Sequence, residues 1–276
     1  MTELTHYKAG ILGWPVAQSR SPQIHNYWLK QYNIDAQYGR YGIDPAHDFK
    51  SELRKLMDAG WRGANVTAPH KETAFAAADR LSQTAQQLGA VNILKFESGE
   101  IIGDNSDGYG FIENLIAQSE IYDWSGARVN VLGAGGAARA IVAALDAAGV
   151  SEIHIYNRSR DRAEGIAKLS SKTRIGHWSD RSAGLVDCDL LVNTTSLGMV
   201  GKPPLEIDLT DMTGCVCDIV YAPLETLLLA QARAHQLKSV DGLGMLLYQA
   251  VPAFEQWFGV RPEVDKTLRA QILSTL

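Results

Sequence analysis

The sequence predicts an α/β protein of two domains with a mostly parallel sheet. Two observations lead to this prediction. Strand-like apolar runs alternate with helix-like stretches along most of the 276 residues, and one glycine-rich turn joins a strand-like run to an alanine-rich helix over 127–149. Parallel strands need a crossover connection between them, which a helix usually supplies, so this alternation indicates α/β architecture.

Composition narrows the class of protein. A formal net charge of −5 argues against a nucleic-acid partner, because phosphate backbones bind clustered basic side chains. No apolar run reaches the roughly 18 residues that a membrane-spanning helix needs, and the N-terminus lacks the regions of a signal peptide. Three cysteines without a CxxC pair, and no His/Cys/acid cluster, predict neither a disulfide framework nor a metal site. We expect a soluble cytoplasmic protein.

The first third of the chain contains the candidate elements of one α/β domain. Residues 7–13 suit a buried strand, and a helix follows with Ser21 as its N-cap and Pro22 at its first position. The apolar side chains that recur on one face of this helix are Ile24, Tyr27, Trp28 and Tyr32. Further strands are expected within 36–43 and 63–66, with a helix over 46–58 between them.

A second unit begins near residue 125. Residues 127–132 suit a strand, and the glycine turn after it leads into a helix that ends at Gly149, a residue type common just past a helix. Apolar runs over 151–158, 188–196 and 215–220 suit central strands. A helical stripe returns from Leu243. We therefore assign 107–241 to one domain, and 1–106 with 242–276 to the other.

The glycine turn has the pattern of a dinucleotide-binding loop. Gly133, Gly135 and Ala138 occupy the three small positions of G-x-G-x-x-G/A. The first glycine permits a tight turn, the second lets the backbone approach a pyrophosphate, and the third position lets helix and strand pack closely. The helix N-terminus that follows offers free N–H groups to phosphates. A strand before and a helix after the pattern favour this interpretation over simple packing.

Two arginines follow the next strand where NAD-binding proteins place a carboxylate. Asn157, Arg158 and Ser159 stand there, and no acid occurs before Asp161. A ribose 2′-phosphate is repelled by an acid and held by guanidinium groups, so Arg158 and Arg162 favour NADP over NAD. Arg160 suits a solvated neighbour. The missing acid also argues against a methyltransferase, which would hold the ribose of S-adenosylmethionine with one.

Short polar motifs elsewhere suit a ligand site but also have structural explanations. Thr67 and Lys71 follow a strand, where ligands bind in open α/β sheets. Asp107 precedes a helix, as Ser21 does, so either could be a helix cap. Asn92 and Asn105 could be turn residues. Taken one at a time, these positions leave both explanations open.

Together the motifs resemble the shikimate dehydrogenase family. "SRSP", "NVTAPHK", "GAVN", "GDNSDG", "GAGGAAR", "YNRSRDR", "NTTSLGM" and "GLGMLLYQA" occur in the family's order, from Gly13 to about Gly259. The resemblance implies an N-terminal α/β substrate domain, a Rossmann-type NADP-binding domain, and reversible reduction of 3-dehydroshikimate to shikimate with NADPH in aromatic amino-acid biosynthesis. The near alternative is a quinate/shikimate dehydrogenase that uses NAD. A more distant one is a non-catalytic ligand sensor on the same fold.

The resemblance also assigns roles to residues. It implies that Lys71 and Asp107 are catalytic, with Lys71 bonding the carbonyl oxygen and either supplying the proton or stabilising charge. The substrate-binding residues that it implies are Ser19, Ser21, Thr67, Asn92, Gln249 and Tyr221, of which Tyr221 would border the nicotinamide. The cofactor-binding residues are Gly133, Gly135, Gly136, Ala137, Asn157, Arg158, Ser159, Arg162, Thr194, Ser196, Met199 and Gly242. Ser106 and Ser159 stand where the family commonly has threonine. The expected partner is a small molecule, and the expected assembly is a monomer or homodimer.

Overall fold

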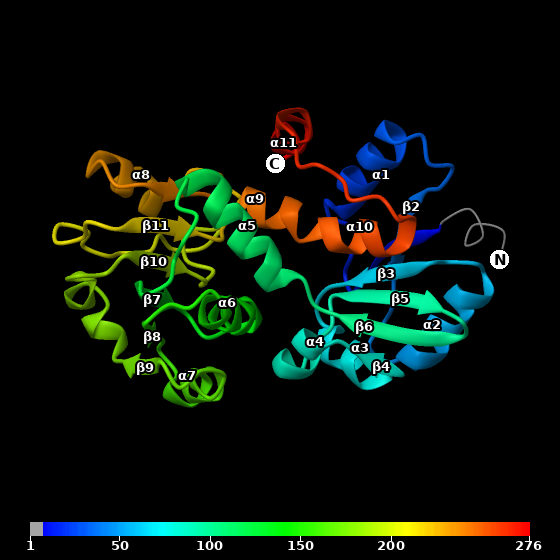
Figure 1. Cartoon of the computed structure of the whole chain (residues 1–276), viewed down its shortest axis with the longest axis horizontal. Coiled ribbons are helices and arrows are strands. Elements are labelled where there is room, and N and C mark those ends of the chain that lie inside the picture. Colours follow the sequence, from blue (N-terminus) through cyan, green and yellow to red (C-terminus); the bar gives the residue numbers. More distant parts are fainter. Residues whose placement is uncertain (1–7) are drawn as a thin grey trace. The chain divides into compact units, whose positions relative to one another are not determined.

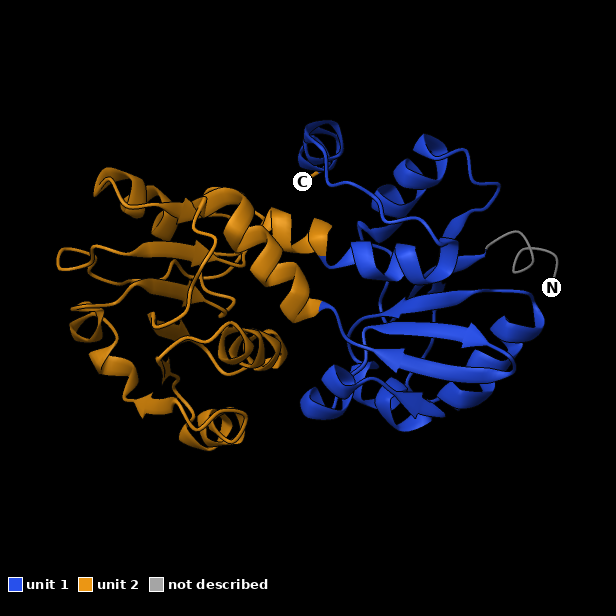
Figure 2. Cartoon of the chain, in the orientation of Figure 1, with its two compact units in different colours: residues 1–106, 249–275 blue, residues 107–248, 276 orange. Residues whose placement is uncertain are grey.

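The computed structural model describes residues 8–276, which form two compact units (Figure 2). The first unit contains the described residues up to 106 together with 249–275. The second contains 107–248 and the last residue, Leu276. Each unit has its own six-stranded sheet, so each is described separately. No helix within 8–276 is long and apolar enough to cross a membrane.

The first unit is built on a mixed sheet whose strands lie in the order β2-β1-β3-β5-β6-β4 (Figure 1). These strands are β1 (Ala9–Gly13), β2 (Tyr38–Gly42), β3 (Gly63–Val66), β4 (Arg80–Leu81), β5 (Ile93–Glu97) and β6 (Glu100–Asp104). Strand β5 runs antiparallel to β3 and β6, and the other pairs are parallel. Ser98 and Gly99 connect β5 to β6 with φ of 53° and 81°. Two positive φ values in a two-residue loop match the twist of a hairpin.

Helices pack on this sheet through apolar faces. They are α1 (Ser21–Gln31), α2 (Phe49–Asp58), α3 (Lys71–Ala77), α4 (Gln83–Leu88), α10 (Ala250–Phe258) and α11 (Lys266–Leu273). The prediction that Ser21 caps α1 is wrong, because the N-cap is Arg20 and Ser21 is the first helical residue. The Arg20 carbonyl accepts from the backbone N–H groups of Gln23 and Ile24, so the first turn begins one residue earlier.

The second unit has six parallel strands in the order β12-β11-β10-β7-β8-β9, with the first strand in the chain at the centre. They are β7 (Arg128–Leu132), β8 (Glu152–Tyr156), β9 (Thr173–Gly176), β10 (Leu190–Asn193), β11 (Cys215–Asp218) and β12 (Ser239–Val240). Its helices are α5 (Asp107–Ser119), α6 (Gly136–Ala147), α7 (Arg160–Ala167), α8 (Leu227–Ala234) and α9 (Leu243–Tyr248), with short 3₁₀ turns at Trp178–Asp180 and Ala183–Leu185. This is the strand order of the Rossmann fold.

The helical stripe that the sequence shows from Leu243 is divided between the two units. Helix α9 packs against α5 in the second unit, and a side chain at Gly244 would collide with Asn114. Helix α10 packs on the first unit, where Trp257 donates from Nε1 to the Leu94 carbonyl at 2.9 Å. Gln249 stands between them. The units therefore divide at 249, whereas the sequence analysis placed the boundary at 242, because close packing on α5 holds 242–248 in the second unit.

Candidate functional site

Four loops of the first unit meet at one edge of its sheet. Strands β1, β3 and β6 end at this edge, and the antiparallel strand β5 begins there, since Ile93 pairs with both Asn65 and Asp104. The loops that follow or precede these ends carry Ser19, Thr67, Asn92 and Ser106. Ligands bind beyond the carboxyl ends of strands in open α/β sheets. This edge is the candidate substrate site.

The loop after β3 fixes the start of helix α3, and so the position of Lys71. The Thr67 backbone N–H donates to the Leu12 carbonyl at 2.9 Å, and the Val91 N–H donates to the Lys71 carbonyl at 3.0 Å. His70 is 3 % exposed, and its Nε2 lies 2.6 Å from the Ile43 carbonyl. A carbonyl only accepts, so Nε2 carries the proton. These bonds hold Lys71, which is half-buried, as the first residue of α3.

The loop between β1 and α1 brings two serine hydroxyls together. The Oγ atoms of Ser19 and Ser21 lie 3.3 Å apart, and the Ser21 backbone N–H donates to Ser19 Oγ at 3.3 Å. Arg40 in β2 donates from Nη2 to the Ser19 carbonyl at 2.7 Å, which places a positive charge beside this loop. Small hydroxyls near a cation form a suitable environment for a carboxylate.

Asn92 and Gln249 come together through Ser106. Ser106 donates from its backbone N–H to Asn92 Oδ1 at 2.9 Å and from Oγ to the Gln249 carbonyl at 2.7 Å. Asn105, the next residue back, donates from Nδ2 to the Ala90 carbonyl at 3.0 Å and ties the same two loops. The structure thus joins residues that lie far apart in the sequence.

Asp107 belongs to the other unit. It is 7 % exposed and is the first residue of α5, while Ser106 is the last residue of this stretch of the first unit. The next residue, Gly108, lies so close to α6 that a Cβ there would be 3.0 Å from the Ala140 carbonyl. Pairing of Lys71 with Asp107 therefore stays a prediction.

The glycine turn of the second unit has the geometry that the sequence predicts. Gly133 follows β7 with φ of +104°, and its N–H donates to the Tyr156 carbonyl at 2.9 Å. A Cβ at Gly133 would lie 2.7 Å from Thr194 Oγ1. Gly135 is the N-cap of α6, Gly136 is its first residue, and a Cβ at either would meet nothing within 4 Å. The open N-terminus of α6 is therefore suited to phosphate groups.

The loop after β8 keeps two of its three arginines out of ion pairs. Asn157 donates from Nδ2 to the Ser159 carbonyl at 2.7 Å, and Ser159 is the N-cap of α7. Arg160 pairs with Glu164 at 2.9 Å. Arg158 and Arg162 are exposed, and neither has an ion-pair partner among residues 8–276. Arg160 therefore has a structural partner, while Arg158 and Arg162 are the arginines that an anion could bind.

The turn after β10 rests on a buried polar pair that the sequence analysis did not identify. Asn193 and Asp218 are both 0 % exposed, and Asn193 Nδ2 donates to Asp218 Oδ1 at 2.9 Å. Burial raises the pKa of Asp218 to about 6, although Thr226, the Val220 N–H and Asn193 all donate to it. The Asn193 oxygen accepts from the Thr195 backbone and hydroxyl. A polar residue at the end of each apolar run was the available signal.

The remaining predicted residues lie at the same edge of the parallel sheet. Thr194 donates from Oγ1 to the Leu132 carbonyl at 2.7 Å, next to the glycine turn. Ser196 and Met199 are exposed in the loop after β10, and Met199 is 44 % exposed. Tyr221 follows β11 and is half-buried, while Gly242 follows β12 at a point where a side chain would collide with the Ile219 carbonyl. These positions surround the ends of β10, β11 and β12.

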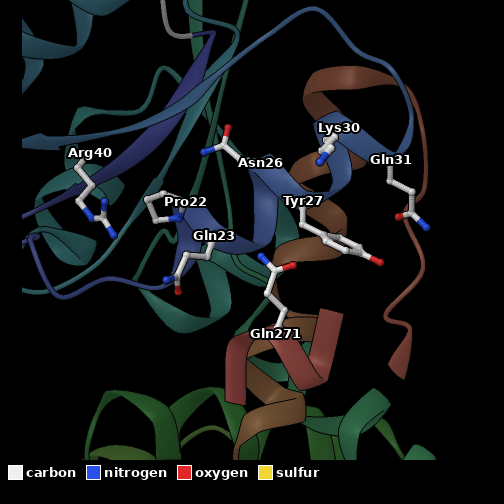
Figure 3. A pocket seen from close by; sticks show the side chains of 8 residues that line it. All are labelled: Pro22, Gln23, Asn26, Tyr27, Lys30, Gln31, Arg40 and Gln271. Atoms are coloured by element: carbon white, nitrogen blue, oxygen red, sulfur yellow. The ribbon is translucent and has the colours of Figure 1, made fainter. Parts of the chain in front are cut away.

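A pocket on another part of the first unit does not coincide with the predicted site. It has a volume of about 740 Å³ and is lined by Pro22, Gln23, Asn26, Tyr27, Lys30, Gln31, Arg40 and Gln271 (Figure 3). Asn26 exchanges two hydrogen bonds with the backbone of Tyr38, and Tyr27 donates to Asp265 at 2.8 Å. Much of its polar lining is thus engaged with the protein itself. No group of three or more potential metal-ligating residues occurs within 8–276.

Three family models match the chain. The shikimate dehydrogenase substrate binding domain matches residues 11–94, the shikimate / quinate 5-dehydrogenase model matches 115–199, and the shikimate 5′-dehydrogenase C-terminal domain matches 242–270. The first covers the loops with Ser19, Thr67 and Asn92, and the second covers the glycine turn and the arginine loop. The matches therefore fall on both sheet edges described above.

Relatives agree with these matches. The chain is 49% identical, over 96% of its length and 98% of the relative's, to the shikimate dehydrogenase (NADP(+)) of Paramagnetospirillum magneticum. Among solved structures it is similar to shikimate 5-dehydrogenase of Thermus thermophilus in complex with NADP(H) and shikimate (33% identity, 98% and 99% coverage, TM-score 0.84). It is also similar to quinate dehydrogenase of Corynebacterium glutamicum in complex with NAD (29% identity, 96% and 98% coverage, TM-score 0.89). The chain belongs to the shikimate dehydrogenase family.

Proposed function

We propose that this protein is an NADP-dependent shikimate dehydrogenase, which reversibly reduces the ketone of 3-dehydroshikimate to the secondary alcohol of shikimate. The observation that carries the proposal is the sheet edge of the first unit. There the hydroxyls of Ser19, Ser21 and Thr67 stand on loops next to those of Lys71 and Asn92. Hydroxyl and amide groups suit a small polyhydroxylated acid, because each of its polar atoms can find a partner.

The cofactor proposal rests on the second unit. The turn at Gly133 and the open N-terminus of α6 fit a pyrophosphate, and Arg158 and Arg162 fit a 2′-phosphate. NADPH supplies the hydride when it is bound. The chain's own groups then bind and orient the two reactants and exclude water. We assign the first unit to substrate and the second to cofactor.

Lys71 is the residue that we propose to serve the carbonyl oxygen. Its ammonium group would donate a hydrogen bond to that oxygen and stabilise the negative charge that develops there. Asp107 would orient Lys71 and accept from a neighbouring hydroxyl. The carboxylate of the substrate would lie at Ser19 and Ser21, beside Arg40. The ring hydroxyls would meet Asn92 and Gln249.

The main competing function is oxidation of quinate with NAD, since one structural neighbour is a quinate dehydrogenase in complex with NAD. The arginine loop argues against it, because no carboxylate stands between Tyr156 and Asp161 to bind two free ribose hydroxyls. The 49% identical relative is also named for NADP(+). A cytoplasmic location and a monomeric or homodimeric state stay predictions.

One spectrophotometric assay separates these functions. Purified protein is given shikimate or quinate, each with NADP or NAD, and reduced cofactor is followed at 340 nm (the ordinary nicotinamide absorbance, roughly). We expect kcat/KM to be highest for shikimate with NADP. Preference for quinate with NAD would support the competing function, and turnover of none of the four pairs would contradict an enzyme of this class.

A further inference from the structure

Ser106 lies at a junction of three chain segments in the first unit. It follows β6, is 2 % exposed, and contacts the loop before β5 and the residue before α10. Neither its type nor its burial marks it as a ligand-binding residue. Its hydrogen bonds, however, reach two of the residues proposed to bind the substrate.

The bonds to Asn92 determine which way its amide points. The Ser106 backbone N–H donates to Asn92 Oδ1 at 2.9 Å, and Asn92 Nδ2 lies 3.3 Å from Ser106 Oγ. A backbone N–H can only donate, so it requires the amide oxygen on its side. Rotating the amide by 180° would set two donors against each other in a site that is 5 % exposed at Asn92. Ser106 therefore fixes where Asn92 presents its NH₂ group and where it presents its oxygen.

The bond to Gln249 fixes a second segment. Ser106 Oγ donates its only proton to the Gln249 carbonyl at 2.7 Å, so the same oxygen is an acceptor toward Asn92 Nδ2. Gln249 is the N-cap of α10, with φ of −61° and ψ of −21°, between two helices. Its backbone carbonyl is thereby held at one point relative to Asn92. A chain of hydrogen bonds in one direction strengthens each member.

We infer that Ser106 is a positioning residue for substrate recognition: its hydroxyl sets the amide of Asn92 and the backbone from which the Gln249 side chain extends. The inference rests on the proposed function, since it assumes that Asn92 and Gln249 bind the substrate ring. Ser106 touches neither the substrate nor the cofactor in this role. A serine that served folding alone would affect stability and leave substrate affinity unchanged.

The test compares Ser106→Ala with Ser106→Thr, which keeps the hydroxyl. We expect the KM for shikimate to rise about tenfold in the alanine variant, as for the loss of a hydrogen bond, and kcat to fall less. The KM for NADP should stay within about twofold, because the cofactor groups are not attached to this network. The threonine variant should return the KM for shikimate to within about threefold of wild type. Ser119→Ala, a change of an equally buried serine in α5, is the control.

Three outcomes decide the inference. Failure of the wild-type protein to oxidise shikimate contradicts the proposed function and with it the inference. Normal wild-type turnover, with a lowered melting temperature but an unchanged KM for shikimate in Ser106→Ala, overturns the inference alone. Should the alanine variant fail to fold, Ser106→Cys, which retains volume with a weaker donor, must show a raised KM for shikimate, and an unchanged KM would equally overturn it.

Discussion

The two sheets of this protein prepare their edges for ligands in different ways. In the first unit the antiparallel strand β5 brings its amino end to the carboxyl ends of β3 and β6, so side chains from four loops meet. In the second unit all strands are parallel, and the edge consists of strand-to-helix turns. The first edge presents hydroxyl, amide and ammonium groups, whereas the second presents backbone N–H groups at Gly135 and Gly136 and the guanidinium groups of one loop.

This difference follows the chemistry that each edge has to recognise. A polyhydroxylated ring has polar atoms in fixed directions, which oriented side chains can match one by one. A pyrophosphate is a diffuse anion, which a helix N-terminus binds with backbone groups that any sequence carries. Side-chain substitutions should therefore affect catalysis most strongly in the first unit. In the second unit, backbone conformation and net charge should matter more.

The largest expected effect is that of Lys71→Ala. Loss of its ammonium group should lower kcat for shikimate oxidation by about 10²–10⁴-fold with a modest change in KM, because the interaction matters most in the transition state. NADP binding should be retained, since Lys71 belongs to the other unit. Asp107→Asn should be similarly damaging, and the double variant far less than additive, where Asp107 acts through Lys71.

Lys50→Ala is a matched control for the lysine. Lys50 lies in the same unit, is 46 % exposed and pairs with Asp79, so its loss should leave kcat within about twofold. Turnover of Lys71→Ala within a few-fold of wild type would exclude the mechanism proposed here. A surface lysine at the start of a helix would give that result.

The sequence predicts the second unit more completely than the first. The strand, glycine turn and helix over 128–147 follow from local pattern, and Gly133 has the positive φ that the tight turn requires. The glycine at 149 also has a positive φ, of 81°. In a parallel α/β unit each strand and its turn are consecutive, so the loop chemistry can be inferred without knowing the whole fold.

The first unit depends on contacts that local pattern does not reveal. Strands β5 and β6, the divided helix at Gln249 and the role of Ser106 all arise from segments far apart in the chain. Ser106 stood out in the sequence only as a serine in place of a common threonine. The motifs supplied the residues of this site through the family resemblance, but hydrogen-bond partners such as Asn92 and Gln249 required coordinates.

A pH experiment tests whether the two cores also differ. In the first unit His25 is 0 % exposed and stacks on Tyr38 with ring centroids 4.2 Å apart. Burial lowers its pKa from 6.5 to about 3. The unfolded chain therefore binds a proton below about pH 6.5 that the folded unit refuses until about pH 3, and stability falls as pH drops through this range. At pH 4.5 the loss should be about 3 kcal/mol.

Comparison of the wild type with His25→Phe, which keeps an aromatic ring beside Tyr38, isolates this effect. Urea unfolding followed by tryptophan emission should show a smaller loss between pH 7 and 4.5 for the variant. Asp218 in the second unit has the opposite sign, because its pKa is raised to about 6, so its contribution to stability is full at low pH and is lost as pH rises through 6. Equal pH slopes for wild type and His25→Phe would contradict a neutral buried histidine.

A smaller effect is expected for Arg158→Ala, which tests the charge of the second edge. Removing a charge-assisted contact should cost about 1.5–3 kcal/mol of NADP binding, or about ten- to hundredfold in affinity, with little change for NAD. Arg160→Ala removes the same charge from the same loop, but Arg160 pairs with Glu164, so its affinity should change by no more than about twofold. Equal losses of NADP and NAD affinity in Arg158→Ala would mean that Arg158 does not contact the 2′-phosphate.

The smallest expected effects separate two glycines of one turn. Gly133 has φ of +104°, and an added Cβ would lie 2.7 Å from Thr194 Oγ1, so Gly133→Ala should lower the free energy of unfolding by about 1–3 kcal/mol without any ligand. Gly135 has φ of −96°, and an added Cβ would meet nothing within 4 Å. Gly135→Ala should therefore change the free energy of unfolding by no more than about 0.5 kcal/mol.

Cofactor binding should rank these two variants in a different way. At Gly135 a methyl group would stand between the backbone and the pyrophosphate, so NADP affinity should fall by about tenfold although the free protein is intact. Thermal unfolding without cofactor and fluorescence titration with NADPH measure the two properties separately. If Gly135→Ala bound NADPH as wild type does, the backbone at this turn would not approach the pyrophosphate. The second edge would then depend on its arginines alone, and the contrast with the side-chain site of the first unit would disappear.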